Sequence, residues 1–220
     1  MTDGPRVALT FDVEHPDRPD HGEHAGEILD ELKRLDIRAT AFIQGRWAEA
    51  NPALARRWAD DGHLVGSHTF YHARMPLLTE AGFIEDVHEA ERVINETVGV
   101  DPRPWLRFPF GAGADADDVV GRLPGLGYRH IGWHVEVYEW EPGRTPEEVV
   151  DRVIAGVAEH GDGAIVLLHT WPDPVPPALP EIVERLRAQA WRFTRVDELD
   201  LSDDLAPVGV PQPGMAAGVT

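Results

Sequence analysis

Short apolar runs alternate along the chain with longer segments in which apolar residues recur at helical spacing. A run of about 4–8 residues between turn-forming residues is typical of a strand buried on both faces of a sheet. The longer segments are typical of helices that bury one face. Strands are expected at residues 7–13, 37–43, 63–66, 105–108, 128–134, 164–169 and 191–196. Helices are expected at residues 25–35, 52–61, 80–98, 115–123, 146–160 and 180–190.

The ends of several expected helices carry residues that commonly cap them. Thr79 and Thr145 each precede a helix and are typical N-cap residues. Gly62 and Gly99 each follow a helix, as expected of a C-terminal cap. Because strand and helix alternate with short connections, we predict parallel strands joined by crossover helices. An open sheet and a closed barrel both satisfy this pattern.

The length of 220 residues fits a single domain. No stretch approaches the ~20 apolar residues of a membrane helix. The first six residues lack the order of a secretory signal, in which basic residues precede apolar ones. We therefore expect a cytoplasmic protein with no membrane partner. The chain has no cysteine, which excludes disulfides and thiolate metal sites.

The chain is strongly acidic, with a formal net charge of −19 and Lys33 as its one lysine. Such a surface repels nucleic acid, which is therefore not expected as a partner. Self-repulsion is better tolerated at high ionic strength, where the Debye length falls to about 3 Å at 1 M. Two explanations stay open, a salt-adapted (halophilic) source and an ordinary acidic protein from a GC-rich genome. The sequence does not indicate an oligomeric state.

Polar side chains follow the C-terminal ends of five expected strands, the edge at which parallel α/β proteins build their sites. His68 and His72 would share one face if the backbone turned helical after its strand, and paired imidazoles suit a zinc-type ion. Strand alternation places Asp12 and Glu14 on one side. The other strand ends carry Arg107, Glu139 with Trp140, and His169.

These groups together indicate metal-assisted hydrolysis of an amide or ester. Glu14, His68 and His72 would give a divalent metal two imidazoles and one carboxylate. Such a metal polarises a carbonyl and lowers the pKa of a water molecule. Asp12 would act as general base, and His169 would protonate the departing nitrogen as general acid.

Further groups would support this acid–base pair. Arg107 would hold Asp12 in place and keep it ionised through a charge-assisted hydrogen bond. Glu139 would bond His169 and raise its pKa. The Pro/Gly turn at residues 107–111 would aim the backbone N–H of Phe110 at a developing oxyanion.

Five ordered motifs resemble those of the polysaccharide deacetylases, the NodB-homology family or carbohydrate esterase family four. Three motifs of that family, H-S/T-x-x-H, R-x-P-Y/F-G and L-x-H, are complete at residues 68–72, 107–111 and 167–169. Two are altered: T-F-D-D-G is T-F-D-V-E at residues 10–14, and D-x-x-D-W is E-V-Y-E-W at residues 136–140.

The resemblance extends from residue 7 to about residue 199. It implies a distorted (β/α) barrel of about seven parallel strands, which we place at residues 1–199, before a loose Pro-, Gly- and Ala-rich tail at residues 200–220. It also implies hydrolysis of acetyl groups on N-acetylated amino sugars, in a glycan or a glycan precursor, with O-acetyl groups as an open alternative. The implied cofactor is a divalent metal, with zinc as the first expectation. Phe110, Trp140 and Leu167 are expected to bind the carbohydrate substrate.

The first motif departs from the family at a position where a metal ligand is expected. Val13 stands in place of the second aspartate and has no atom that binds a metal. Glu14 is one residue further on and shares the face of Asp12, so we expect the ligand to move there, with His15 as a weaker substitute. The glutamates at 136 and 139 keep the charge of the family's aspartates but reach one methylene further.

Two other functions stay open. One is a metal-independent amidohydrolase on the same barrel, acting on a small cyclic amide or ureide. The other is a catalytically inactive barrel that binds glycans. Metal content distinguishes the first from a deacetylase, and acetate release distinguishes the second.

Overall fold

Strands and helices alternate through residues 4–17 and 21–201, the part of the chain that this computed structural model describes. The strands are β1 (Arg6–Val13), β2 (Thr40–Ile43), β3 (Leu64–Ser67), β4 (Trp105–Leu106), β5 (Arg129–His130), β6 (Val135–Glu136), β7 (Ala164–His169) and β8 (Arg192–Thr194). The α-helices are α1 (His21–Arg34), α2 (Gly45–Ala50), α3 (Pro52–Asp60), α4 (Glu80–Thr97), α5 (Asp117–Val120), α6 (Pro146–His160) and α7 (Val175–Ala188).

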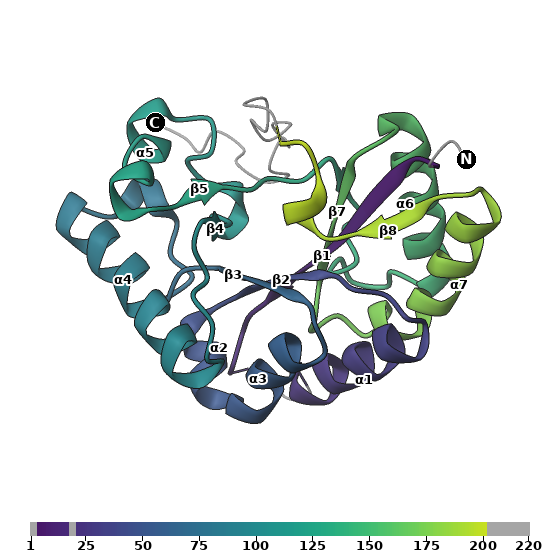
Figure 1. Ribbon diagram of the computed structural model, residues 1–220, viewed down its shortest axis with the longest axis horizontal. Helices are drawn as coiled ribbons and strands as arrows, with labels where there is room; N and C mark the ends of the chain where they lie inside the picture. Colours follow the sequence, from purple (N-terminus) through teal and green to yellow (C-terminus); the bar gives the residue numbers. More distant parts are fainter. Residues whose placement is uncertain (1–3, 18–20, 202–220) are drawn as a thin grey trace, which may run out of the picture.

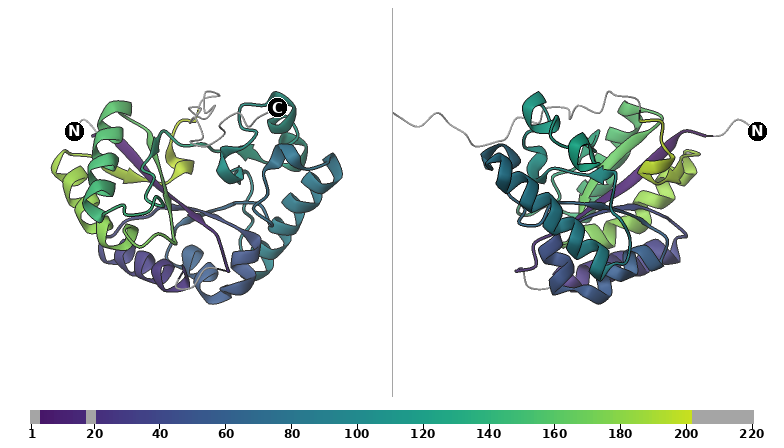
Figure 2. Two further views of the ribbon diagram at one scale, coloured as in Figure 1. Left: turned by 180° about the vertical axis from the view of Figure 1, so that it is seen from behind. Right: turned by 60° about the vertical axis from the view of Figure 1, so that its left-hand side comes forward.

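The strands form one curled parallel sheet. Their order across it is β5-β4-β3-β2-β1-β7-β6, and β8 pairs with the first half of β1. Every pairing is parallel. The sheet bends into a half-barrel with the helices along its outer side (Figures 1 and 2). The predicted distorted (β/α) barrel is therefore confirmed.

Strand β1 pairs with β2, β7 and β8, and its residues point alternately into two cores. Its odd-numbered residues, Phe11 among them, join the main apolar core between the sheet and the outer helices. Ala8 faces the barrel interior, where it packs in a smaller cluster with Phe42 and Trp133. The same parity turns Asp12 and the following Glu14 inward, as the sequence predicted. The alternation of side chains along β1 thus places both carboxylates inside the barrel.

The segment at residues 128–134, predicted as one strand, contains only the short strand β5, and β6 begins just after it. Residues 131–134 connect β5, at one end of the sheet, with β6 at the other. The cause lies partly in Arg107, whose Nε and Nη2 donate to the carbonyl oxygens of Ile131 and Gly132. These carbonyls bond a buried side chain instead of a neighbouring strand, so β5 ends at His130.

Other boundaries also differ from prediction. Helix α2 was not predicted, because six residues are too few for a helical period to show. Helix α5 has only four residues. Helix α7 begins at Val175 and contains Pro180, where the helix was expected to start. Prolines fit the first turn of a helix, whose N–H groups have no intrahelical acceptor, so the proline-rich stretch before Pro180 can already be helical.

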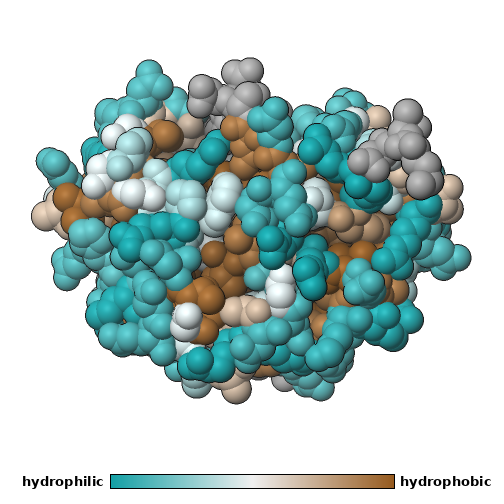
Figure 3. All heavy atoms as spheres, in the orientation of Figure 1, coloured by the Kyte–Doolittle hydropathy of each residue, from teal (hydrophilic) through white to brown (hydrophobic). Residues whose placement is uncertain are grey.

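The surface seen in Figure 3 is mainly hydrophilic, and apolar residues gather near its middle. Within residues 4–17 and 21–201, none of the helices has the length and apolar character that crossing a membrane requires. Most of the predicted tail, residues 202–220, lies outside the described residues.

Candidate active site

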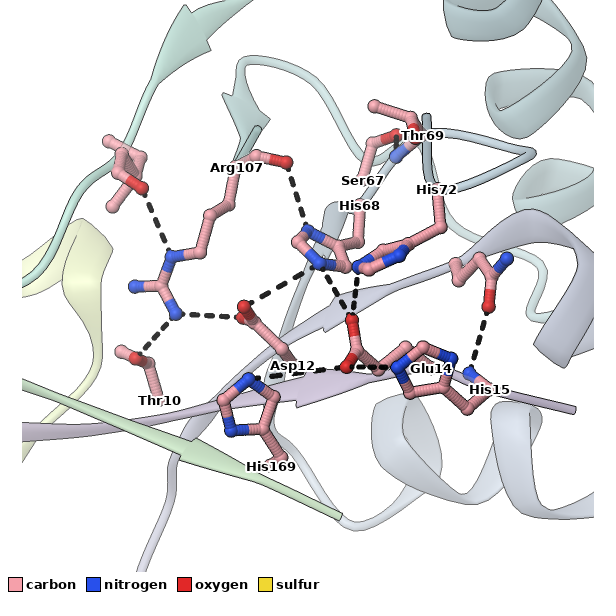
Figure 4. A network of polar contacts seen from close by, with 12 residues as sticks. Thr10, Asp12, Glu14, His15, Ser67, His68, Thr69, His72, Arg107 and His169 are labelled. Carbon is pink, nitrogen blue, oxygen red and sulfur yellow. Dashed lines mark hydrogen bonds and ion pairs between the residues drawn. The ribbon is translucent and has the colours of Figure 1, made fainter. Parts of the chain in front are cut away.

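The side chains expected at the strand ends converge on one place inside the barrel mouth (Figure 4). The pairing of β1 with β7 sets Asp12 directly beside His169. Glu14 follows the end of β1, and His68 follows β3, two strands away. The structure therefore brings together the groups to which the sequence assigned acid, base and ligand roles.

Arg107 is fully buried and anchors Asp12. Its Nη1 donates to Asp12 Oδ1 at 2.8 Å and to Thr10 Oγ1 at 2.9 Å. Its guanidinium also lies 4.2 Å from the ring centroid of Phe42. Burial lowers the pKa of Arg107 and the charge of Asp12 opposes that shift, so this strongly basic group stays a cation. The predicted contact between Arg107 and Asp12 is present.

Glu14, His68 and His72 present ligand atoms that all lie within 4.8 Å of one another. Glu14 Oε2 is 3.2 Å from His68 Nε2 and also contacts His72 Nε2. The Nδ1 of His68 lies 3.0 Å from the carbonyl oxygen of Arg107, which can only accept a hydrogen bond. Nδ1 therefore carries the proton, and in the neutral ring the lone pair of Nε2 is directed at the cluster. This donor set fits a divalent metal of the zinc type.

The electrostatics of the cluster favour an ionised carboxylate. Burial alone raises the pKa of Glu14, but hydrogen bonds from His15, His68 and His72 outweigh burial and hold that pKa well below its usual value. Burial lowers the pKa of His72, and Glu14 only partly offsets this. Burial lowers the pKa of His68, but the charges of Asp12 and Glu14 raise it overall. Glu14 is therefore in the ionised state that a metal requires, whereas metal binding at His68 would release a proton.

The helical turn that would place His68 and His72 on one face is absent at residues 68–72, although both histidines reach the cluster. Thr69 and His72 have left-handed backbone φ angles of 61° and 60°. Asp86 Oδ1 accepts from the N–H groups of Phe70, at 2.6 Å, and Tyr71, at 3.0 Å. These N–H groups are therefore bonded to a side chain of α4 rather than within a helical turn.

Glu139 forms two hydrogen bonds with His169, and a bond between these two residues was predicted from the sequence. Its Oε1 accepts from His169 Nδ1 at 2.8 Å and from the His169 backbone N–H at 2.7 Å. Burial on its own lowers the pKa of His169, but the charge and hydrogen bond of Glu139 raise it to about 10. His169 is therefore protonated at neutral pH, and its Nε2 carries the proton that faces the site.

The three residues expected to bind substrate occupy different depths. Phe110 and Trp140 are 46% and 37% exposed, whereas Leu167 is 3% exposed. The Phe110 ring lies 4.6 Å from the His72 ring, between centroids. Leu167 packs in the interior cluster beside Trp133. Their roles toward a substrate, and that of the Phe110 N–H toward an oxyanion, stay predictions.

Several contacts that shape the site were not predicted from the sequence. Trp171 Nε1 donates to Glu14 Oε1 at 3.0 Å, and Gln44 Nε2 donates to the Phe70 carbonyl at 3.2 Å. Nothing in the spacing of Trp171 or Gln44 pointed to these contacts. Asp86 offered one signal, an acidic residue beside Val87 on the apolar face of an expected helix.

Comparison with known proteins assigns the chain to a family. Residues 1–131 match the family model for polysaccharide deacetylases. The chain therefore belongs to the polysaccharide deacetylase family, and the resemblance to that family is confirmed.

Relatives of known description cover most of the chain. It is 31% identical over 194 residues to the peptidoglycan-N-acetylglucosamine deacetylase PgdA of Listeria monocytogenes, which covers 88% of this chain but only 38% of that protein. A solved structure described as the T48 deacetylase with substrate has a TM-score of 0.74 and 32% identity, with coverage of 88% of this chain and 89% of that one. A pseudoenzyme of carbohydrate esterase family 4 from Bacillus anthracis has a TM-score of 0.79 and 27% identity, with coverage of 90% and 66%.

Proposed function

We propose that this protein is a metal-dependent hydrolase that removes acetyl groups from N-acetylated amino sugars, in a glycan or a glycan precursor. The observation that carries the proposal is the cluster of Glu14, His68 and His72 beside an anchored carboxylate. Asp12 Oδ2 lies 3.5 Å from His68 Nε2, so the base and the ligands share one space. The names of the relatives support an acetylated sugar as substrate.

The reaction follows from where each group lies. A divalent metal bound by the cluster would polarise the acetyl carbonyl and acidify water. Asp12 takes a proton from the attacking water as the new C–O bond forms, and the hydrogen bond from Arg107 holds Asp12 in place. His169 gives its Nε2 proton to the nitrogen as the C–N bond breaks. The products are acetate and a free amino sugar.

An inactive glycan-binding barrel remains the alternative, because one structural relative is described as a pseudoenzyme. The Asp12–Arg107 and His169–Glu139 pairs favour an active enzyme, since each pair orients one proton-transfer group through a hydrogen bond. Zinc as the metal, a cytoplasmic location and a salt-adapted source stay predictions.

The test combines acetate release from N-acetylglucosamine oligomers with elemental analysis of the same samples. We expect near-stoichiometric metal and acetate release in the wild type. Asp12→Asn should retain the metal and lose about 10²–10⁴ in rate, the usual contribution of a general base. His68→Ala should lose metal and activity together. A folded, metal-loaded wild type that releases no acetate from any acetylated glycan would overturn the proposal.

A further inference from the structure

The two carboxylate oxygens of Glu14 have different neighbours (Figure 4). Oε2 is the oxygen that lies against His68 and His72. Oε1 accepts a hydrogen bond from Trp171 Nε1 at 3.0 Å and lies 3.0 Å from His15 Nε2. The side chain of Glu14 is only 4% exposed, so protein groups rather than solvent surround both oxygens.

The indole nitrogen of Trp171 can interact with Glu14 only as a hydrogen-bond donor. An indole N–H is a donor with no lone pair to offer, so it cannot replace a carboxylate as a metal ligand. Its hydrogen bond to Oε1 occupies that oxygen and fixes the rotation of the carboxylate. His15 occupies the same oxygen from another side. Oε2 alone is then directed at the two histidines.

The position of Glu14 explains why such support is useful. Glu14 follows the last residue of β1 and has one more rotatable bond than the aspartate that the family motif places one residue earlier. Each rotatable bond adds conformations that metal binding must remove. Trp171 comes two residues after the end of β7, the strand that pairs with β1, so its indole crosses from one strand end to the next.

The backbone around Glu14 is fixed as well. Gln44 Oε1 accepts from the His15 N–H at 3.0 Å, while Gln44 Nε2 donates to the Phe70 carbonyl at 3.2 Å. One side chain thus links the segment that carries Glu14 with the loop that carries His68 and His72. With the backbone held in this way, the remaining freedom of Glu14 lies in its side chain, where Trp171 acts.

We propose that Trp171 is a positioning residue for the metal centre, holding Oε1 of Glu14 so that Glu14 binds a metal through Oε2 alone. This inference rests on the proposed metal centre and goes beyond it, because it assigns the denticity of one ligand and the residue that sets it. His15 contributes the second contact to Oε1.

The test replaces the indole donor and keeps an aromatic ring. Trp171→Phe is compared with the wild type by Co²⁺ titration, in competition with a chromophoric chelator, without substrate. We expect the dissociation constant to rise about 10–100-fold, the usual effect of losing a hydrogen bond to a ligand. We also expect weaker visible absorption by bound Co²⁺, because the released Oε1 adds a ligand to the metal.

Two variants make the result specific. Trp191→Phe makes the same chemical change at a partly buried tryptophan just before β8, which pairs with the start of β1 rather than the end that leads to Glu14, and it should leave the dissociation constant and spectrum unchanged. His15→Asn should shift both readouts in the direction of Trp171→Phe. Circular dichroism and thermal unfolding of each metal-free variant establish that it is folded.

The outcomes separate this inference from the proposed function. Equal affinity and an equal Co²⁺ spectrum in the wild type and in Trp171→Phe would overturn the role of Trp171 alone. The role would also be wrong if Trp171→Phe lowered the unfolding temperature but left the spectrum unchanged. A wild type that binds no divalent metal would overturn the inference together with the metal centre.

Discussion

The two halves of the candidate site are built from different kinds of structure. In the acid–base half, Asp12 and His169 belong to β1 and β7 and are register partners. In the ligand half, His68 and His72 belong to a loop with two left-handed residues, Thr69 and His72. Strand register sets the direction of side chains in the first half. Hydrogen bonds from side chains to the loop backbone do so in the second.

This difference determines where each half is vulnerable. The acid–base half depends on a few buried charge pairs whose members are themselves the reacting groups or touch them. The ligand half depends on groups such as Gln44 and Asp86, which bond the loop backbone rather than a metal ligand's side chain. Substitution of these groups should therefore lower metal affinity, while the rate of the metal-loaded enzyme should change little.

The largest expected effect is on the acid–base half, from Arg107→Met. Arg107 is fully buried, and its loss leaves Asp12 as a buried charge without its cation. Breaking a buried ion pair in this way costs about 3–5 kcal/mol of unfolding free energy. Deacetylation should also fall by about 10²–10⁴, because the general base loses its orientation. Urea unfolding and acetate release measure the two effects.

Arg103→Met is the matched control for that experiment. Arg103 pairs with Asp101 at 2.7 Å, but its side chain is 44% exposed. An exposed pair of this kind contributes about 0–1 kcal/mol. Similar losses of stability in the two variants would show that burial of Arg107 is not what matters.

The next effect concerns His169 and its pH dependence. Glu139 raises the pKa of His169 to about 10, so the acid form is present at neutral pH and is lost as pH rises through that pKa. A bound divalent cation lowers this pKa in every variant, so the comparison between variants is the informative quantity. In Glu139→Gln the pKa of His169 falls, and the alkaline limb of kcat/KM should move to lower pH. Activity on the alkaline side should drop by about 10–100-fold.

Glu136→Gln provides the comparison for Glu139. Glu136 lies in the same segment, but its Oε2 accepts from Trp133 Nε1 at 3.3 Å rather than from His169. Its removal should shift the alkaline limb much less. An unchanged pH profile in Glu139→Gln would mean that His169 is not the acid that limits the reaction.

The bounds of helices and strands could be predicted where capping residues or an unbroken apolar run mark their ends. Helix α6, which begins after its cap Thr145, and strand β7 have the bounds that the sequence indicated. Residues 128–134 could not be predicted, because a side chain distant in sequence bonds two of their carbonyls. Helix α7 was mispredicted because prolines usually open a helix, and here they lie within its first two turns.

The candidate site likewise has parts that the sequence predicted and parts that it could not predict. Strand parity predicted that Asp12 and Glu14 share a face, and the contacts of Arg107 with Asp12 and of Glu139 with His169 are present. The loop geometry at residues 68–72 could not be predicted, because its hydrogen bonds involve Gln44 and Asp86, and no sequence pattern links either residue to this loop. Trp171 could not be linked to Glu14 for the same reason, since the two are 157 positions apart.

The smallest expected effect tests the ligand half through Asp86. Its Oδ1 accepts the N–H groups of Phe70 and Tyr71, which lie between the two histidines. Asp86→Ala leaves both donors without that acceptor, at a cost of about 1–3 kcal/mol for a buried group. Metal affinity should fall about 10-fold, the lower end for a group that supports ligands. Metal titration and thermal unfolding of the metal-free protein measure these effects.

Asp86→Asn sharpens that experiment, because it keeps one oxygen acceptor and removes the charge. Burial raises the pKa of Asp86, so its charge is not well stabilised there, and its Oδ2 has no partner among the described residues. The amide should therefore retain most of the metal affinity that alanine loses. Equal losses in the two variants would show that the charge of Asp86, rather than its bonds to the loop, supports the histidines. Loss of activity at full metal occupancy in either variant would contradict the separation of the site into two halves.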